Sequence, residues 1–152
     1  MEPSDSVETM TTTFSQRPAT LSDLGWLERL REQSMRAELE ALGRWDPRQS
    51  RLRIEDALRT ADVRIIKDGH RSVGSIAWTR AKDGWRLHLF YLDASARDAG
   101  LGSAILTRGL AEHPGTVRLV TLIGSRARAL YERVGFRFEF TQGVDEHMVL
   151  VR

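Results

Sequence analysis

Two Asp-Gly pairs constrain the fold of this chain more than any other feature. They stand at residues 68–69 and 83–84, and each separates two stretches rich in β-branched, aromatic and aliphatic residues. Two-residue hairpin turns favour Asp-Gly, because both turn positions need a positive φ. We therefore expect three consecutive antiparallel strands, over residues 63–67, 72–79 and 85–92.

Helical spacing of apolar residues dominates on both sides of this unit. Thr20 and Asp23 have the form of a capping box, and Asp46-Pro47 is a second start signal. The expected helices are 24–42, 47–60, 100–113 and 125–134. Between the last two, a continuous apolar stretch over residues 117–123 predicts a strand that is covered on both faces.

Three further strands, over residues 14–17, 136–140 and 147–151, complete the predicted order β-α-α-β-β-β-α-β-α-β-β. Helices and strands in this order predict an α/β (α+β) domain with a mixed, mostly antiparallel central sheet flanked by helices. We expect one domain over residues 13–152, preceded by a flexible leader over the polar residues 1–12.

Composition narrows the function classes. The chain has no cysteine, and its four histidines lack zinc-site spacing, so we expect no metal. A net charge of +2 disfavours nucleic acid, and no apolar run predicts a membrane helix, so we expect a cytoplasmic protein. Charges alternate in sign around Arg29 and Arg31, which predicts a solvent-exposed helix face.

Residues 92–103 link a strand to a helix and place Gly100 and Gly102 where the helix begins. The first turn of a helix has unpaired N–H groups and a positive dipole end, and glycine lets a phosphate approach the backbone. Two glycines in a loop are by themselves more often plain turn chemistry. A dinucleotide-binding site would need a parallel β-α-β unit, whereas this loop follows antiparallel strands.

A second segment, residues 125–136, follows the next strand. Together the two segments resemble the GCN5-related N-acetyltransferase (GNAT) family. Arg97, Gly100 and Gly102 match the family's pyrophosphate loop, [Q/R]-x-x-G-x-[G/A]. The family's N-x-x-A-x-x-L-Y-E-x-x-G-F helix is matched, with the alanine shifted by one position, by Ala129, Leu130, Tyr131, Glu132, Gly135 and Phe136.

The resemblance implies an N-acetyltransferase that uses acetyl-CoA as co-substrate and transfers the acetyl group to a primary amine by direct attack in a ternary complex. It implies that the backbone of Leu92 and Asp93 pairs with the pantetheine arm, and that Tyr131 protonates the departing thiolate as general acid. The remaining expected acetyl-CoA contacts are Arg97, Asp98, Ala99, Gly100, Leu101, Gly102, Ser103, Ser125 and Arg128.

Some positions depart from the family pattern. Asp98 and Ala99 stand where a glycine and a basic residue are usual, and Asp98 puts a negative charge beside the expected diphosphate. Ser125 replaces the common asparagine. These differences predict weaker acetyl-CoA binding rather than a different fold.

His88 is a candidate general base acting through water, because it lies on the strand that leads into the glycine loop. Strand alternation places it on one face with Arg86 and Phe90, and a half-buried structural histidine is an equal alternative. Trp45, in a loop before a helix, is a candidate for acceptor binding. Further base candidates are Asp93, Glu139, Asp145, His147 and a solvent chain.

Three functions stay open at this point. The first is an acetyltransferase for a small-molecule or peptide amine, which the two motifs favour. The second is an acyl-CoA-binding regulatory module with weak catalysis, which the altered loop favours. The third is a toxin-type acetyltransferase acting on aminoacyl-tRNA, which the small net charge disfavours. A homodimer is also left open.

Overall fold

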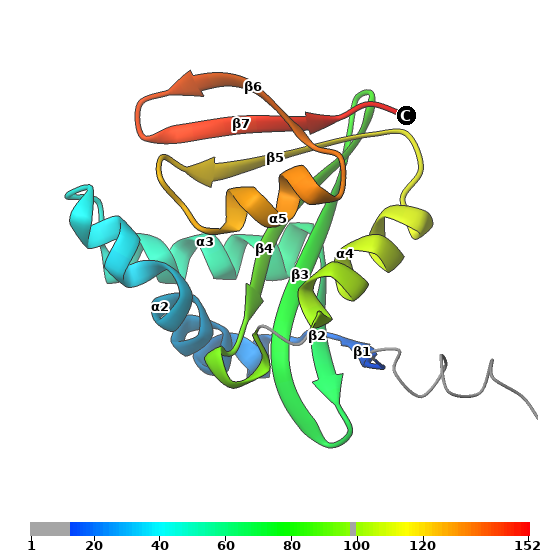
Figure 1. The fold of residues 1–152 in the computed structure, drawn as a ribbon. Coiled ribbons are helices and arrows are strands. Elements are labelled where there is room, and N and C mark those ends of the chain that lie inside the picture. Colours follow the sequence, from blue (N-terminus) through cyan, green and yellow to red (C-terminus); the bar gives the residue numbers. More distant parts are fainter. Residues whose placement is uncertain (1–12, 98–99) are drawn as a thin grey trace, which may run out of the picture.

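The computed structural model describes residues 13–97 and 100–152 and shows one sheet with helices on both faces (Figure 1). The helices of the described residues are η1 (Leu21–Asp23), α2 (Leu24–Ala41), α3 (Pro47–Thr60), η2 (Ala94–Ala96), α4 (Leu101–Glu112) and α5 (Ala127–Arg133). The strands are β1 (Ser15–Pro18), β2 (Asp62–Asp68), β3 (Arg71–Ala81), β4 (Gly84–Leu92), β5 (Thr116–Leu122), β6 (Arg137–Gln142) and β7 (Asp145–Leu150).

The seven strands lie in the order β1-β2-β3-β4-β5-β7-β6. Within the described residues, β4 and β5 form the only parallel pair, and the other neighbours are antiparallel. The predicted element order and the mixed, mostly antiparallel sheet are therefore confirmed.

Two apolar clusters hold the helices to the sheet. Leu27 of α2 and Ile54 of α3 pack with sheet residues such as Ala77 on one face. On the other face, Ile105 of α4 and Tyr131 of α5 join a larger cluster. The sheet is thus covered on both faces, as the apolar character of its central strands requires.

The last hairpin differs from its prediction. Its strands run to Gln142 and start at Asp145, with Gly143 at the turn in a left-handed conformation (φ 61°). The ends of both strands next to the turn are polar, so the sequence did not predict that they pair. β6 is an exposed edge strand, and its residues therefore lack the alternation of buried and exposed positions that predicts a strand.

Parts of the prediction lie outside the described residues, namely the leader over residues 1–12 and the contacts assigned to Asp98 and Ala99. In the part of the chain that the structure covers, no helix combines the length and the apolar character that crossing a membrane requires.

Candidate functional site

The central feature of the site is an opening in the sheet between β4 and β5. The two strands pair only over Gly84–Arg86 and Thr116–Arg118, although β4 continues to Leu92 and β5 to Leu122. Beyond this short contact the strands diverge (Figure 1). Their facing backbone groups resemble those of a sheet edge, to which an extended molecule can add by hydrogen bonding.

A β-bulge in β4 lies beside this opening. Ala77 pairs with His88 and Ser75 pairs with Tyr91, so one residue of β3 opposes two residues of β4. Leu89 takes a left-handed conformation there (φ 48°), and its carbonyl accepts a 2.7 Å hydrogen bond from the buried Ser75 hydroxyl. Because leucine seldom adopts this conformation, the Ser75 bond is a specific support for the bulge.

The bulge changes which side chains share a face. His88 pairs with Ala77 on the α2–α3 face, and Leu89 belongs to the same cluster. Phe90 instead packs on the opposite face, with its ring centroid 6.4 Å from that of Tyr131. The prediction that Phe90 shares a face with His88 is therefore wrong, because alternation breaks at the extra residue.

A cavity of about 1040 Å³ occupies the opening and extends between α2, α3, α5 and β7. This volume is at the upper end of the ~300–1,000 Å³ usual for small-molecule sites. Among the residues predicted from the sequence, the cavity brings together Trp45, His88, Ser125 and Tyr131, together with the weaker base candidates Asp145 and His147.

Tyr131 lies at the wall of this cavity and is only 7% exposed. Its ring sits between Phe90 and Phe136, at centroid distances of 6.4 and 5.9 Å. Burial, and secondarily the nearby Tyr91, raises the pKa of the Tyr131 hydroxyl well above its usual value, so the group keeps its proton at neutral pH.

The direction of the Tyr131 hydroxyl follows by elimination. Across the described residues, every fully buried polar side-chain atom has a hydrogen-bond partner, whereas no bond to the Tyr131 hydroxyl is formed there. The hydroxyl is therefore not sealed inside the core but reaches the cavity. A protonated, cavity-facing phenol is chemically suited to donate a proton.

His88 lines the cavity in its neutral form. Burial lowers its pKa to about 4, with smaller contributions from Arg86 and Arg53. Its Nε2 atom shares a 2.8 Å hydrogen bond with the Thr79 hydroxyl. A neutral imidazole can accept a proton, although a pKa this low makes it a weak base.

Arg31 is a cavity residue that sequence reasoning missed. The alternating charges predicted an exposed helix face, yet Arg31 is 6% exposed, while Arg29 is exposed as predicted. The error has a geometric cause: Arg31 follows the buried Leu30 and lies four positions from Leu27, so it belongs to the core-facing side of α2. Its position in the apolar helical spacing was the available signal.

The glycine loop leads into the start of α4, which packs beside the end of β4. Gly100 has the left-handed conformation (φ 78°), and no side chain of the described residues caps α4, which starts at Leu101. The N–H groups of its first turn, including those of Gly102 and Ser103, are those that an α-helix leaves unbonded. A Cβ atom on Gly102 would come within 3.3 Å of Leu130 and 3.4 Å of Leu92, so this turn is closely packed against both.

Helix α2 anchors the preceding loop. The Ala94 amide donates to the Gln33 side chain at 3.0 Å, and the Arg97 guanidinium donates to the Leu92 carbonyl (3.1 Å) and to Ser34 (3.2 Å). The Arg97 side chain thus points back toward α2, and the Arg97 amide, which was predicted to contact the phosphate, already donates to the Ala94 carbonyl at 3.3 Å.

The other predicted acetyl-CoA residues have protein partners of their own. The Asp93 amide donates to Val73, and the Asp93 carboxylate accepts from the Ser95 amide at 3.0 Å. The Ser125 hydroxyl accepts from the Ala127 amide at 3.2 Å, at the start of α5. The Arg128 guanidinium forms ion pairs with Glu132 (3.1 Å) and Glu146 (3.0 Å).

Trp45 and Asp46 lie between α2 and α3. The Arg36 guanidinium stacks over the Trp45 ring at 5.6 Å, and Asp46 caps α3 by accepting from the Arg48 and Gln49 amides. The Asp46 carboxylate therefore has a structural task. Glu139, a weaker base candidate, forms an ion pair with Arg118 at 3.5 Å.

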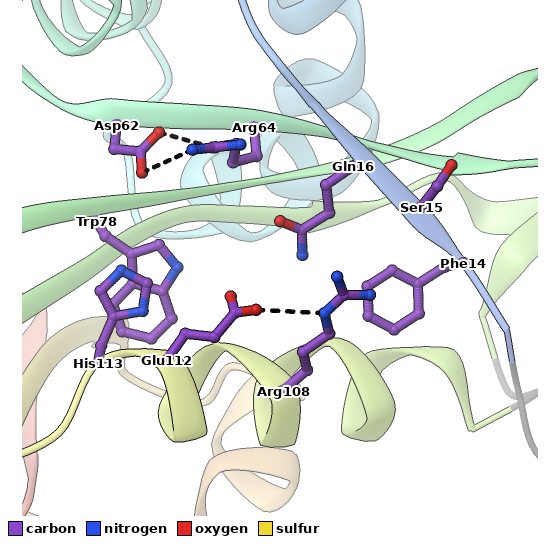
Figure 2. A pocket seen from close by; sticks show the side chains of 9 residues that line it. All are labelled: Phe14, Ser15, Gln16, Asp62, Arg64, Trp78, Arg108, Glu112 and His113. Atoms are coloured by element: carbon purple, nitrogen blue, oxygen red, sulfur yellow. Dashed lines mark hydrogen bonds and ion pairs between the residues drawn. The ribbon is translucent and has the colours of Figure 1, made fainter.

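A second hollow of about 430 Å³ lies between the β1–β2 edge of the sheet and α4. Figure 2 shows its charged side chains turned toward one another. Asp62 pairs with Arg64 at 2.8 Å and Arg108 with Glu112 at 3.5 Å, while the His113 ring stacks on Trp78. The four charged side chains that line the hollow thus form two ion pairs and carry no net charge together.

Solved structures share this fold. An acetyltransferase from Thermus thermophilus superposes with a TM-score of 0.74 at 19% identity, over 93% of this chain and 98% of the other. The PaiA N-acetyltransferase from Thermoplasma acidophilum, solved in complex with coenzyme A, gives 0.71 at 14% identity, over 93% and 100%. A ribosomal-protein alanine N-acetyltransferase from Escherichia coli gives 0.67 at 16% identity, over 91% and 94%.

No curated protein matches the sequence. A family model does match it: the acetyltransferase (GNAT) domain aligns with residues 59–138, which is more than half of the chain. This segment contains the divergent strands, the glycine loop and Tyr131. The chain therefore belongs to the GNAT acetyltransferase family.

Proposed function

We propose that this protein transfers the acetyl group of acetyl-CoA to a primary amine by direct attack in a ternary complex. One observation carries the proposal: a protonated tyrosine, Tyr131, faces a large cavity at the point where β4 and β5 separate. Family membership and the structure of a relative with coenzyme A support the choice of acetyl donor.

The residues present fit an extended acyl-CoA molecule. Unpaired backbone of β4 and β5 suits the amide-rich pantetheine arm, and the uncapped start of α4 suits its diphosphate. The proposed contacts are the backbone of Leu92 and of residues 97–103, with Ser125 and Arg128 at the start of α5. The Asp93 amide already donates to the Val73 carbonyl and the Asp93 carbonyl accepts from the Ala96 amide, so both backbone groups of Asp93 have partners within the protein.

The proposed chemistry needs three proton transfers. The free amine attacks the thioester carbonyl, the C–S bond breaks, and Tyr131 gives its proton to the departing sulfur. The nitrogen then loses one proton to become the amide, and a proton returned through water restores the Tyr131 hydroxyl. The acceptor arrives as an ammonium ion and must lose a proton before it attacks, since only the free amine is a nucleophile. His88 lines the same cavity but has a pKa of about 4, so we propose that it relays this proton through water rather than holding it.

The experiment is turnover with a panel of primary amines. Release of CoA is followed with a thiol reagent, which gives no protein background because the chain has no cysteine. Acetylated amine is identified by mass spectrometry in amounts equal to the CoA released. Acetyl-CoA binding with no turnover on any amine would support the regulatory module in place of the enzyme.

A further inference from the structure

Arg31 is buried, and its hydrogen bonds go to hydroxyl groups rather than to a carboxylate. Its Nε donates to the Tyr91 hydroxyl at 3.1 Å and its Nη1 to the Ser50 hydroxyl at 2.8 Å. Ser50 is itself 5% exposed, so α2, α3 and β4 together hold the guanidinium in one orientation. Both partners are neutral hydroxyls.

No carboxylate balances this charge within the part of the chain that the structure describes. None of the ion pairs there includes Arg31. Burying a guanidinium costs free energy, and such a group is usually paired with an anion. Among the described residues, the structure therefore holds a fixed, largely buried guanidinium without a carboxylate partner.

The free donors of Arg31 face the cavity. A guanidinium has five N–H groups, and the two hydroxyls use two of them. Fully buried polar side-chain atoms without a partner do not occur in the described residues, so Nη2, which forms no bond there, is accessible. Arg31 lines the same cavity as Tyr131, so accessible here means open to that cavity.

The surrounding charges reinforce this preference. Arg44, Arg53 and Arg86 also line the cavity, and none of them has an ion pair among the described residues. Of the two aspartates in the lining, Asp46 caps α3, and Asp145 lies on the far wall, in β7. The α2–α3 side of the cavity is thus cationic.

We propose that the acceptor amine carries an anionic group, a carboxylate or a phosphate ester, and that Arg31 binds this group. The inference rests on the proposed function and specifies its substrate class. The anion lies on the α2–α3 side, and the amine reaches through the opening between β4 and β5 toward Tyr131. A free polyamine or another purely cationic amine is a poor acceptor in this arrangement.

The test uses pairs of amines that differ only in the anionic group: L-leucine with L-leucinamide, and phosphoethanolamine with ethanolamine. Binding to the full chain is measured by calorimetry at about pH 6, where all four amines are protonated. The wild type should bind the anionic member of at least one pair about 10- to 100-fold more tightly, as expected for a charged hydrogen bond. The pair in which the anionic member binds more tightly shows whether the site prefers a carboxylate or a phosphate.

Arg31→Met should abolish this preference, while Arg29→Met, at an exposed site of the same helix, should retain it. In turnover, Arg31→Met should lower kcat/KM for the acceptor that carries the anionic group about 10- to 100-fold and leave kcat/KM for the member without that group within about threefold. A merely structural arginine would instead affect both members equally.

The outcomes separate the two proposals. Arg31-dependent anion binding without acetylation of any amine would support the anion site and refute the proposed function. Acetylation with equal affinity for both members of both pairs would support the proposed function and refute the anion site. If Arg31→Met does not fold, the wild-type comparison alone decides, because equal binding within both pairs overturns the inference.

Discussion

Replacement of Tyr131 by phenylalanine isolates the proton that the proposed mechanism needs. The substitution retains the ring between Phe90 and Phe136 and deletes only a hydroxyl that forms no bond within the described residues. We therefore expect the free energy of unfolding to change by less than about 1 kcal/mol. The lost general acid should lower kcat by about 10²–10⁴-fold.

This loss corresponds to about 3–5.5 kcal/mol in the activation free energy, several times the expected change in stability. Steady-state kinetics with acetyl-CoA varied at a saturating acceptor should show the fall in kcat with little change in KM for acetyl-CoA. Urea unfolding of the same preparations measures the stability change.

The other tyrosine of the chain, Tyr91, provides a matched control. Tyr91→Phe also removes a hydroxyl of a cavity residue, but that hydroxyl accepts a hydrogen bond from Arg31 and has no part in the proposed proton transfer to sulfur. We expect it to raise KM for the acceptor more than it lowers kcat. If Tyr131→Phe keeps full kcat and loses only stability, Tyr131 is a core residue and the catalytic assignment is wrong.

Three other substitutions probe the glycine loop, the bulge and the buried histidine. Gly102→Val should abolish the stabilisation by acetyl-CoA, about 2.7 kcal/mol at 100 times Kd, because a side chain there occupies the packed first turn of α4. The control Gly25→Ala should keep this stabilisation. An undiminished thermal shift in Gly102→Val would place the co-substrate elsewhere. Ser75→Ala should cost about 1–3 kcal/mol in urea unfolding by leaving the Leu89 carbonyl without its bond, and an unchanged midpoint would show that the bulge needs no support from Ser75. His88 has a folded pKa of about 4, below its unfolded value of about 6.5, so the unfolded state binds the extra proton and stability should fall by up to about 3 kcal/mol as pH decreases from 7 to 4; His88→Gln should flatten this part of the profile, and an identical profile would refute the buried neutral imidazole.

The element order could be predicted because its signals are local. The capping box at Thr20 and Asp23 and the cap at Asp46 each act within four residues, and the structure shows both. The two predicted hairpins also form, but their two-residue turns are Gly69-His70 and Lys82-Asp83 rather than the Asp-Gly pairs, because Asp68 and Gly84 are themselves paired in the strands. The approximate position of Tyr131 also followed from a local motif, which places it on the helix after the central strand.

Three features of the site depend on distant residues and were not predictable. The opening exists because β5 leaves β4 after Arg118, and nothing in either strand alone indicates where pairing stops. The bulge at Leu89 depends on a hydroxyl 14 residues away. Arg31 is buried by Ser50 and Tyr91, which come from two other elements, so its charge pattern alone predicted an exposed face.

A single turnover tests direct transfer in this cavity most directly. Excess protein is mixed with isotope-labelled acetyl-CoA and an accepted amine, the reaction is stopped, and the masses of amine and intact protein are measured. We predict that the label appears on the amine nitrogen, that the protein mass stays unchanged, and that Tyr131→Phe slows the appearance of product by about 10²–10⁴-fold. Label on the protein before it reaches the amine, or a Tyr131→Phe rate equal to that of the wild type, would contradict the account.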